Sequence, residues 1–366
     1  MSSSHYFIIS KKLILPLLLS PLLFGCASNP IQSQNMSKQD SQLFFGGPIL
    51  TMQGTSPAYV EAVVVENGRI KFAGDLKQAK KLTEKTTTSI NLNNTTLLPA
   101  FIDAHSHVNS VGLQQTVANL YPAPDGTVSD ITSLIQAMKD WQAKNTAFIQ
   151  ATSGWIIGNG YDDAQLNEKR HPTADDLDQI SKTNPIIILH QSGHLATVNH
   201  KALELLNIDK NTPNPSGGII RRKAGSQEPN GVLEEATVFS AMATAFKQVP
   251  PDLMQNMAKT AIQTYIKNGY TTVQEGRADA GTAELWRYLA NTGELKIDLV
   301  AYPDAMNEKD YMLKHGTSPT YQNHFRIGGV KISLDGSPQG KTAWLTQPYL
   351  IPPEGQDKNY RGYPAY

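Results

Sequence analysis

Cysteine is nearly absent from this chain of 366 residues, which contains only Cys26. A single cysteine excludes an intramolecular disulfide, even in an oxidising compartment. Net charge is missing too, because 32 lysines and arginines balance 32 aspartates and glutamates. Such a balance provides no basic field for nucleic acid and no polybasic surface for anionic lipid. The composition fits best a soluble enzyme that acts on a small molecule.

A hydrophobic run long enough to span a bilayer is also missing. Residues 13–24 have the length of the apolar region of a secretion signal, follow two lysines and end just before Gly25 and Cys26. We therefore expect a bacterial lipoprotein signal peptide over residues 1–25 and lipidation of Cys26. An ordinary secretory peptide or an N-terminal anchor is the alternative. Residues 26–41, rich in serine, glutamine and asparagine, predict a flexible tether.

Two motifs of common enzyme classes are absent as well. The glycines of Gly158-Asn159-Gly160 lack the strand and helix that flank a phosphate-binding loop. No order of serine, histidine and aspartate indicates a nucleophile elbow. Candidate catalytic or binding residues must therefore be sought outside these two motifs.

The segment 97–108, LLPAFIDAHSHV, has the pattern of a buried parallel strand that ends in polar side chains. In an extended backbone the imidazoles of His105 and His107 project from the same face, with Asp103 close enough to support them. Two imidazoles at fixed spacing suit a divalent transition metal. A polar rim at a strand end is the alternative interpretation.

The rest of the chain falls into three patterns. Residues 43–97 predict short strands, with a strand pair around Gly46-Gly47 and a hairpin at Asn67-Gly68. The long stretch that follows predicts a helix at 129–144, a glycine-rich loop at 154–163, a helix capped by Thr173 and a strand at 185–190. After residue 250 strands and helices alternate, as in parallel βαβ units, beginning with a helix capped by Asp252. The expected parallel strands are 101–107, 270–276, 295–303 and 326–336.

FIDAHSH at 101–107 resembles the first-strand metal motif of the metal-dependent amidohydrolase superfamily. Segments between 154 and 235 resemble the branch that includes N-substituted formamide deformylase, amidohydrolase family 3. The resemblance implies an α/β fold: a TIM-like (β/α) barrel over 98–366 with an insertion at about 109–250, and a partial β-sandwich over 42–97. Because about four barrel strands are recognisable and few residues follow Leu334, we expect an incomplete barrel and a chain truncated at its C-terminus.

The resemblance also implies a site for one or two divalent metal ions, expected to be zinc, that activate water against a C–N bond other than a peptide bond. His105 and His107 are the expected ligands. Lys331 is expected to bind metal as a carbamate, or else to pair with a carboxylate such as Asp335. Glu275 is expected to be a ligand, an orienting partner or a solvated carboxylate. The residues expected to face an amide, formamide or cyclic amide substrate are His194, Trp155, Tyr161 and Asp162.

The same resemblance implies what this sequence does not contain. The aspartate that serves as catalytic base, and two further histidine ligands, are expected beyond the C-terminus, so the fragment is expected to be inactive. A lipid-anchored binding protein and a non-functional remnant are the alternatives. We expect the protein to be held to the membrane of the bacterial cell envelope, facing the periplasm, without a nucleic-acid partner. The other histidines expected to be structural or exposed are His171, His190, His200, His315 and His324.

Overall fold

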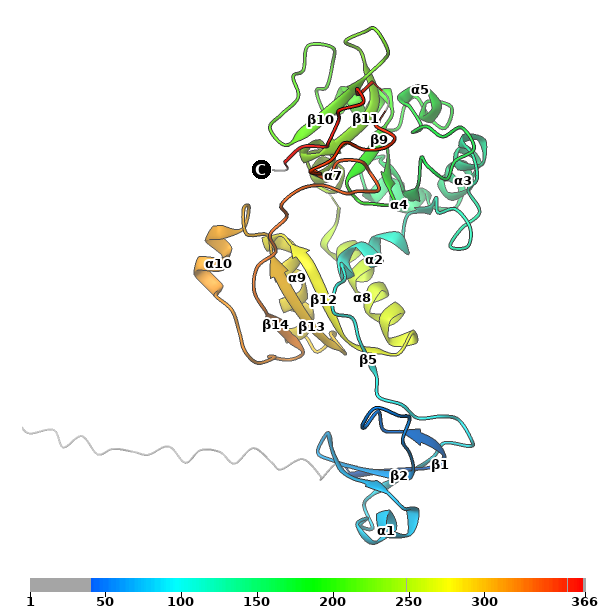
Figure 1. Ribbon diagram of the computed structural model, residues 1–366, viewed down its shortest axis with the longest axis vertical. Helices are drawn as coiled ribbons and strands as arrows, with labels where there is room; N and C mark the ends of the chain where they lie inside the picture. The colour runs from blue at the N-terminus through cyan, green and yellow to red at the C-terminus, as the bar shows by residue number, and fades with distance from the viewer. Residues whose placement is uncertain (1–40, 248, 354, 365–366) are drawn as a thin grey trace, which may run out of the picture. The chain divides into compact units, whose positions relative to one another are not determined.

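The computed structural model describes residues 41–247, 249–353 and 355–364 (Figure 1). The chain divides into two compact units, residues 1–99 and residues 100–366. The predicted signal peptide, the tether and Cys26 lie outside the described residues. Within the described part, no helix has the length and apolar character needed to cross a membrane.

The first unit is built on a four-stranded sheet whose strands lie in the order β3 (Arg69–Gly74), β2 (Tyr59–Glu66), β1 (Ser41–Leu50) and β4 (Thr88–Asn91). The predicted hairpin is confirmed: β2 and β3 pair antiparallel, and Asn67 and Gly68 both have positive φ, as a tight hairpin turn requires. The predicted strand pair around Gly46-Gly47 is wrong. Those glycines lie inside one strand, β1, whose register shifts because Gly46 adopts φ 82°. Helix α1 (Leu76–Lys81) packs its Ala79 into the small core of this unit.

The second unit contains a six-stranded sheet. In spatial order its strands are β10 (Gly218–Arg222), β11 (Pro229–Glu235), β9 (Leu195–Val198), β8 (Ile186–His190), β7 (Ile156–Tyr161) and β6 (Ala118–Asn119). Strand β8 is buried along its whole length, with Ile187 and Leu189 in one core cluster and Ile186 and Ile188 in another. Because both faces of the strand are covered, its sequence is a continuous apolar run.

Short helices surround this six-stranded sheet, and two of their predicted starts are confirmed. The helices are α3 (Ile131–Lys144), α4 (Thr146–Ala151), α5 (Ala174–Leu177), α6 (His200–Leu205) and α7 (Ala236–Phe246). The predicted helix at 129–144 is α3, which begins after Asp130 in a capping box with Ser133. Thr173 caps α5 as predicted, because its hydroxyl accepts the N–H of Asp176.

The second sheet of this unit is parallel throughout. Its strands lie in the order β14 (Phe325–Ile327), β13 (Asp298–Pro303), β12 (Tyr270–Ala278) and β5 (Phe101–Ile102). Helices α8 (Pro251–Lys267) and α9 (Ala280–Asn291) share a core cluster with it, and α2 (Val108–Gln114) and α10 (Lys309–His315) complete the set (Figure 1). The alternation of strand and helix after residue 250 is thus confirmed. Over the described ranges the sheet is open and forms no closed barrel.

The two outer strands of the parallel sheet are shorter than predicted. The strand expected at 101–107 is reduced to Phe101 and Ile102, whose exposed fractions of 50% and 69% contradict the predicted burial. The reason is that β5 pairs on one side only, with β12. The strand expected at 326–336 ends at Ile327, and Lys331 beyond it forms only an isolated bridge with Asp304.

Helix α8 begins differently from the prediction. Pro250 is its N-cap and Pro251 its first residue, so Asp252 lies in the first turn instead of capping the helix. Proline suits this place because the first turn needs no intrahelical N–H donor. Its buried face consists of Met257, Ala258, Ala261, Ile262 and Tyr265.

Candidate functional site

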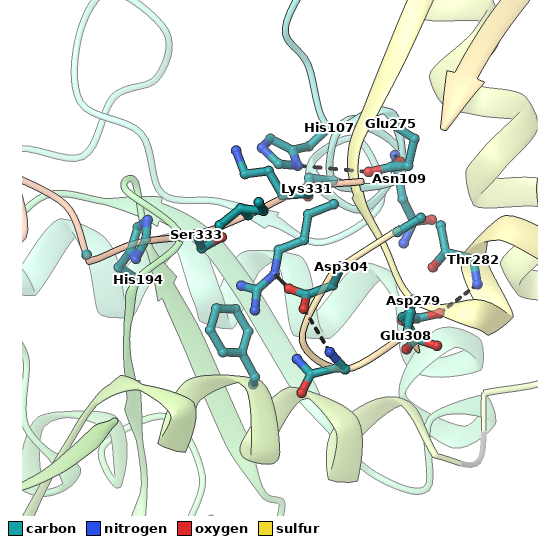
Figure 2. Close-up of a pocket in the computed structure, with 18 of the residues that line it drawn as sticks. His107, Asn109, His194, Glu275, Asp279, Thr282, Asp304, Glu308, Lys331 and Ser333 are labelled. Atoms are coloured by element: carbon teal, nitrogen blue, oxygen red, sulfur yellow. Dashed lines mark hydrogen bonds and ion pairs between the residues drawn. The ribbon is translucent and has the colours of Figure 1, made fainter. Parts of the chain in front are cut away.

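A cavity of about 720 Å³ lies at the carboxyl ends of the parallel strands, with residues from the six-stranded sheet on its other side (Figure 2). Four of the eight residues predicted for metal or substrate binding line it: His107, His194, Glu275 and Lys331. They are far apart in sequence, and the two sheets bring them to one space. The carboxyl ends of parallel strands are where α/β enzymes place their sites.

His107 lies on the wall of this cavity, directly before helix α2. Its Nδ1 is 3.9 Å from Oε1 of Glu275, a contact drawn in Figure 2. Gly276 keeps the space beside the ring, since a Cβ there would lie 2.7 Å from the carbonyl oxygen of Ser106 and 3.2 Å from Cε1 of His107. Burial, followed by the positive charge of Lys331, lowers the pKa of His107 to about 4.

Glu275 is a buried carboxylate with an exposed fraction of 2%, so the solvated alternative does not hold. Its Oε2 accepts the backbone N–H of Asn109 at 2.7 Å, while Oε1 faces His107. Burial raises the pKa of Glu275 to about 7, although the N–H donors of Asn109 and Arg277 act in the opposite direction. The geometry therefore places a buried carboxyl group beside the imidazole of His107.

His105 is exposed and is not among the residues that line the cavity. Its ring lies edge-on to that of His107, with 5.8 Å between the ring centroids. Two imidazoles that share one ion have centroids roughly 5 to 6 Å apart, because each nitrogen lies about 2 Å from a zinc ion. The spacing of the two rings is therefore compatible with one shared divalent ion.

Lys331 lies on the cavity wall opposite Glu275 and is half-buried (Figure 2). Its backbone is held by Pro303 and Ala305, at the end of strand β13. The suggested partner Asp335 is engaged elsewhere, because its Oδ2 accepts the N–H of Trp344 at 2.9 Å. No ion pair between Lys331 and Asp335 occurs within the described ranges.

His194 enters the cavity from the turn between β8 and β9. Its Nδ1 lies 2.9 Å from Oε2 and 3.1 Å from Oε1 of Glu235, the last residue of β11. Glu235 was missed at the level of sequence, because the two residues are 41 positions apart and only the pairing of β9 with β11 joins them.

Trp155, Tyr161 and Asp162 do not line this cavity. Trp155 is buried in the core beside β7. Tyr161 is fully buried, and its hydroxyl lies 3.1 Å from Thr197 Oγ1 and 3.1 Å from His171 Nδ1. These three residues are therefore buried around the six-stranded sheet and do not face the cavity.

Asp162, Asp163 and His190 form a compact polar cluster, with ligand-type atoms all within 4.8 Å of one another. His190 Nε2 is 3.2 Å from Asp163 Oδ1 and 3.8 Å from Asp162 Oδ1, and His171 Nε2 is 3.7 Å from Asp163 Oδ2. Of the histidines expected to be structural or exposed, His190 and His171 are therefore not exposed and belong to this cluster. The sequence signal was the Asp-Asp pair at the end of a strand.

The protonation of His190 decides how this cluster is interpreted. The backbone N–H of Ser192 donates to Nδ1 of His190, so Nε2 carries the ring proton and directs it at the two carboxylates. A metal ion bound here would displace that proton. Burial acts to lower the pKa of His190, but the neighbouring carboxylates of Asp162 and Asp163 outweigh it and the pKa is raised. The same contact with His190 holds the pKa of Asp162 well below its usual range. The cluster thus gathers a buried imidazole and two carboxylates where β7 and β8 end.

A second pair of charges lies on the cavity wall and was also missed. Nε of Arg277 donates to Oδ2 of Asp304 at 2.8 Å, and the guanidinium lies 4.2 Å from the ring centre of Phe239. Arg277 follows Glu275 near the end of β12, and Asp304 directly follows β13. Hydrogen bonds and the charge of Arg277 lower the pKa of Asp304 against the opposing effect of burial.

The chain is similar to known proteins in both sequence and structure. Residues 88–365 match the amidohydrolase family. Amidohydrolase YtcJ of Bacillus subtilis is 28% identical over 325 residues, 85% of this chain and 57% of that protein. N-substituted formamide deformylase of Arthrobacter pascens is 26% identical over 242 residues, 65% of this chain and 43% of that enzyme. The crystal structure of an uncharacterised metal-dependent hydrolase from Pyrococcus horikoshii aligns with a TM-score of 0.63 and 25% identity, over 89% of this chain and 60% of that one. The chain therefore spans about half the length of the curated relatives that it matches.

Proposed function

The chain belongs to the amidohydrolase family, and we propose that the cavity beside His107 is where a divalent metal ion and water hydrolyse a C–N bond other than a peptide bond. One observation carries the proposal: His107, Glu275 and Lys331, from three separate segments, line a single cavity at the strand ends. The proposed substrates are amides, formamides or cyclic amides. The proposed metal is zinc, as one or two ions. We propose this hydrolytic activity for a protein as long as the relatives, of which the present chain covers about half.

Each residue has a proposed part in this chemistry. His105 and His107 would hold the ion through imidazole nitrogens, with Lys331 as an additional ligand from the opposite wall. Glu275 faces Nδ1 of His107 and so leaves Nε2 for coordination. When bound, the ion would polarise the scissile carbonyl and lower the pKa of a water molecule. Arg277, held by Asp304, presents a positive charge to the substrate space.

Metal binding by the purified protein tests this proposal. We expect His107→Ala to weaken the binding of Zn²⁺, measured by equilibrium dialysis, by at least about tenfold, because one imidazole ligand is lost. His200→Ala is the matched control: His200 is a half-exposed histidine paired with Asp178 outside the cavity, and its loss should leave zinc affinity unchanged. The proposal fails if His107→Ala binds zinc as tightly as the wild type.

The same variants separate the cavity from the Asp162 cluster. Asp163→Asn removes a carboxylate of the cluster and should leave zinc affinity unchanged, whereas Lys331→Met should lower it. Release of formate from a simple N-substituted formamide, with zinc added, then measures hydrolysis. Zinc affinity that depends on Asp163 and not on His107 would move the metal site to the cluster and exclude our assignment.

We also propose the domain assignment that the sequence suggested. Residues 42–97 would be part of a β-sandwich, and the parallel sheet would be part of a TIM-like barrel over 98–366, with residues 109–250 as an insertion. The support is the family membership and the four parallel strands β5, β12, β13 and β14. Independent thermal transitions of residues 42–97 and the remainder, seen by calorimetry, would support the boundary.

A lipid anchor at Cys26 and a position on the envelope membrane, facing the periplasm, complete the proposal. It rests on the apolar stretch at 13–24 that precedes Gly25 and Cys26. We expect Cys26→Ser to move the protein from the membrane fraction to the soluble fraction of cells and to abolish incorporation of labelled palmitate. Labelling of the variant equal to that of the wild type would exclude this site.

A further inference from the structure

The pairing of His194 with Glu235 fixes which ring nitrogen of His194 carries a proton. Nδ1 lies within hydrogen-bond distance of both carboxylate oxygens, 2.9 and 3.1 Å away. An ionised carboxylate can only accept, so Nδ1 must be the donor. The other nitrogen of a neutral ring, Nε2, then has a free lone pair. Because Glu235 occupies the Nδ1 edge of the ring and does not itself line the cavity, the Nε2 edge is left for the cavity that His194 lines.

The backbone holds these two residues in register. The N–H of Glu235 donates to the carbonyl of His194 at 2.8 Å, in addition to the side-chain bond in the other direction. The N–H of His194 in turn donates to Oγ of Ser192 at 3.2 Å. Strand pairing continues this arrangement, since Glu234 lies opposite Leu195. The dyad is therefore anchored on strand ends, which position a side chain more firmly than a free loop does.

The backbone of Glu235 is strained in a way that supports a functional role. It adopts φ 52° and ψ −118°, a conformation that residues other than glycine rarely take. At this point the chain leaves β11 and enters α7. Strain of this kind persists where the surrounding structure requires it, and it concentrates at functional sites. Here the strained turn directs the carboxylate at His194.

Glu235 is separated from the cavity by the chain segment around Gly336. A Cβ at Gly336 would lie 2.4 Å from Oε1 of Glu235, so this glycine packs directly against the carboxylate. Gly336 lines the cavity and Glu235 does not. Glu235 has an exposed fraction of 3%. The carboxylate can thus influence a substrate only through His194.

We propose that Glu235 is a positioning residue that holds His194 with its proton on Nδ1, so that Nε2 accepts a hydrogen bond from the N–H group of the substrate amide. This inference rests on the proposed function and refines it. A site built to accept an N–H selects amides that retain one over N,N-disubstituted amides, because the disubstituted substrate leaves Nε2 without a partner. The substrate class is therefore an amide or formamide whose nitrogen bears a hydrogen.

The first test reads the tautomer of His194 directly and needs no substrate. Histidine labelled with ¹⁵N and ¹³C is incorporated, and the ring resonances of His194 are assigned by their absence in His194→Gln. We expect the wild type to carry the proton on Nδ1, and Glu235→Gln to shift the ring toward the Nε2–H form. Glu234→Gln is the matched control, because Glu234 is an equally buried neighbour that binds Arg221 instead. Its spectrum should keep the Nδ1–H form at His194.

The second test compares two substrates, an N-alkylformamide and its N,N-dialkyl analogue, with zinc present. We expect Glu235→Gln and His194→Gln to lower kcat/KM for the N–H substrate by roughly tenfold, the effect of one lost hydrogen bond, and to change the value for the dialkyl substrate much less. Glu235→Asp should recover part of the preference. An Nε2–H ring in the folded wild type overturns the inference even if hydrolysis is observed. An Nδ1–H ring in a protein that hydrolyses neither substrate leaves the dyad intact and counts against the proposed function instead.

Discussion

At the scale of single residues, Gly276 allows the approach of two segments on which the candidate metal site depends. Its N–H donates to the carbonyl of Ser106 at 2.8 Å, and a Cβ would lie 2.7 Å from that same oxygen. We predict that Gly276→Ala displaces His107, weakens zinc binding and destabilises the protein by about 1–3 kcal/mol, as overpacking in a filled interior does. Dialysis and urea unfolding measure the two effects.

Gly281→Ala provides the comparison for this prediction. Gly281 lies in helix α9, where alanine is intrinsically favoured by about 0.5–1 kcal/mol. We expect this variant to keep its zinc affinity and to be at least as stable as the wild type. Equal zinc affinities for the Gly276 variant and the wild type would show that His107 does not depend on the space beside it.

The residue scale also shows how far the sequence could indicate the site. His107, Glu275 and Lys331 could be found because each lies at or near the end of an expected parallel strand, and such ends converge. Glu235 could not be found in this way, since its relation to His194 arises from the antiparallel pairing of β9 with β11. Asp162 was assigned to the substrate space from its loop, and its contact with His190 depends on the register of β7 and β8. Contacts across strands need the sheet order, which periodicity does not supply.

At the scale of elements, the short helix α5 depends on its cap. It has four residues, and Thr173 and Asp176 bond reciprocally across its first turn. We predict that Thr173→Ala destabilises the protein by about 1 kcal/mol, the usual effect of losing an N-cap hydroxyl. Urea unfolding of Thr173→Ser, which keeps the hydroxyl, should reproduce the wild type. An alanine variant as stable as the wild type would show that packing of Leu177 alone maintains the turn.

In the parallel sheet the inner strands were predicted and the edge strands were overestimated, while the inner strand β7 of the six-stranded sheet was wrongly expected to be part of a loop at 154–163. Strands β8 and β12 have neighbours on both sides, and their sequences carry the expected patterns. Strands β5 and β14 lie at the edges of the parallel sheet, so only one neighbour stabilises each of them. After Ile327 two glycines follow, and a Cβ at Gly328 would lie 2.4 Å from Val300. A prediction from apolar residues alone therefore overestimated the lengths of both strands, because a strand also needs neighbouring strands to pair with.

At the scale of the whole molecule, buried histidines make stability depend on pH. Burial, followed by the charge of Arg221, lowers the pKa of His171 to about 3. In the unfolded chain this histidine takes up a proton near pH 6.5. As the pH falls below that value, the unfolded state gains protons that the folded state does not bind, so His171 reduces the free energy of unfolding. Asp163 and His190 of the same cluster also make stability depend on pH, because the pKa of Asp163 is lowered and that of His190 is raised.

A difference measurement isolates His171 from these neighbours. The free energy of unfolding of His171→Gln, minus that of the wild type, should increase as the pH falls from about 6.5 toward 4, with a slope of at most about 1.4 kcal/mol per pH unit, the value for one proton. Tyr161, whose hydroxyl contacts Nδ1 of His171, stays uncharged over this range, since burial raises its pKa far above the usual value. Urea unfolding between pH 4 and pH 8 measures the curve. A difference that does not change with pH would mean that the pKa of His171 is the same in the folded protein as in the unfolded chain, which would contradict the predicted effect of burial.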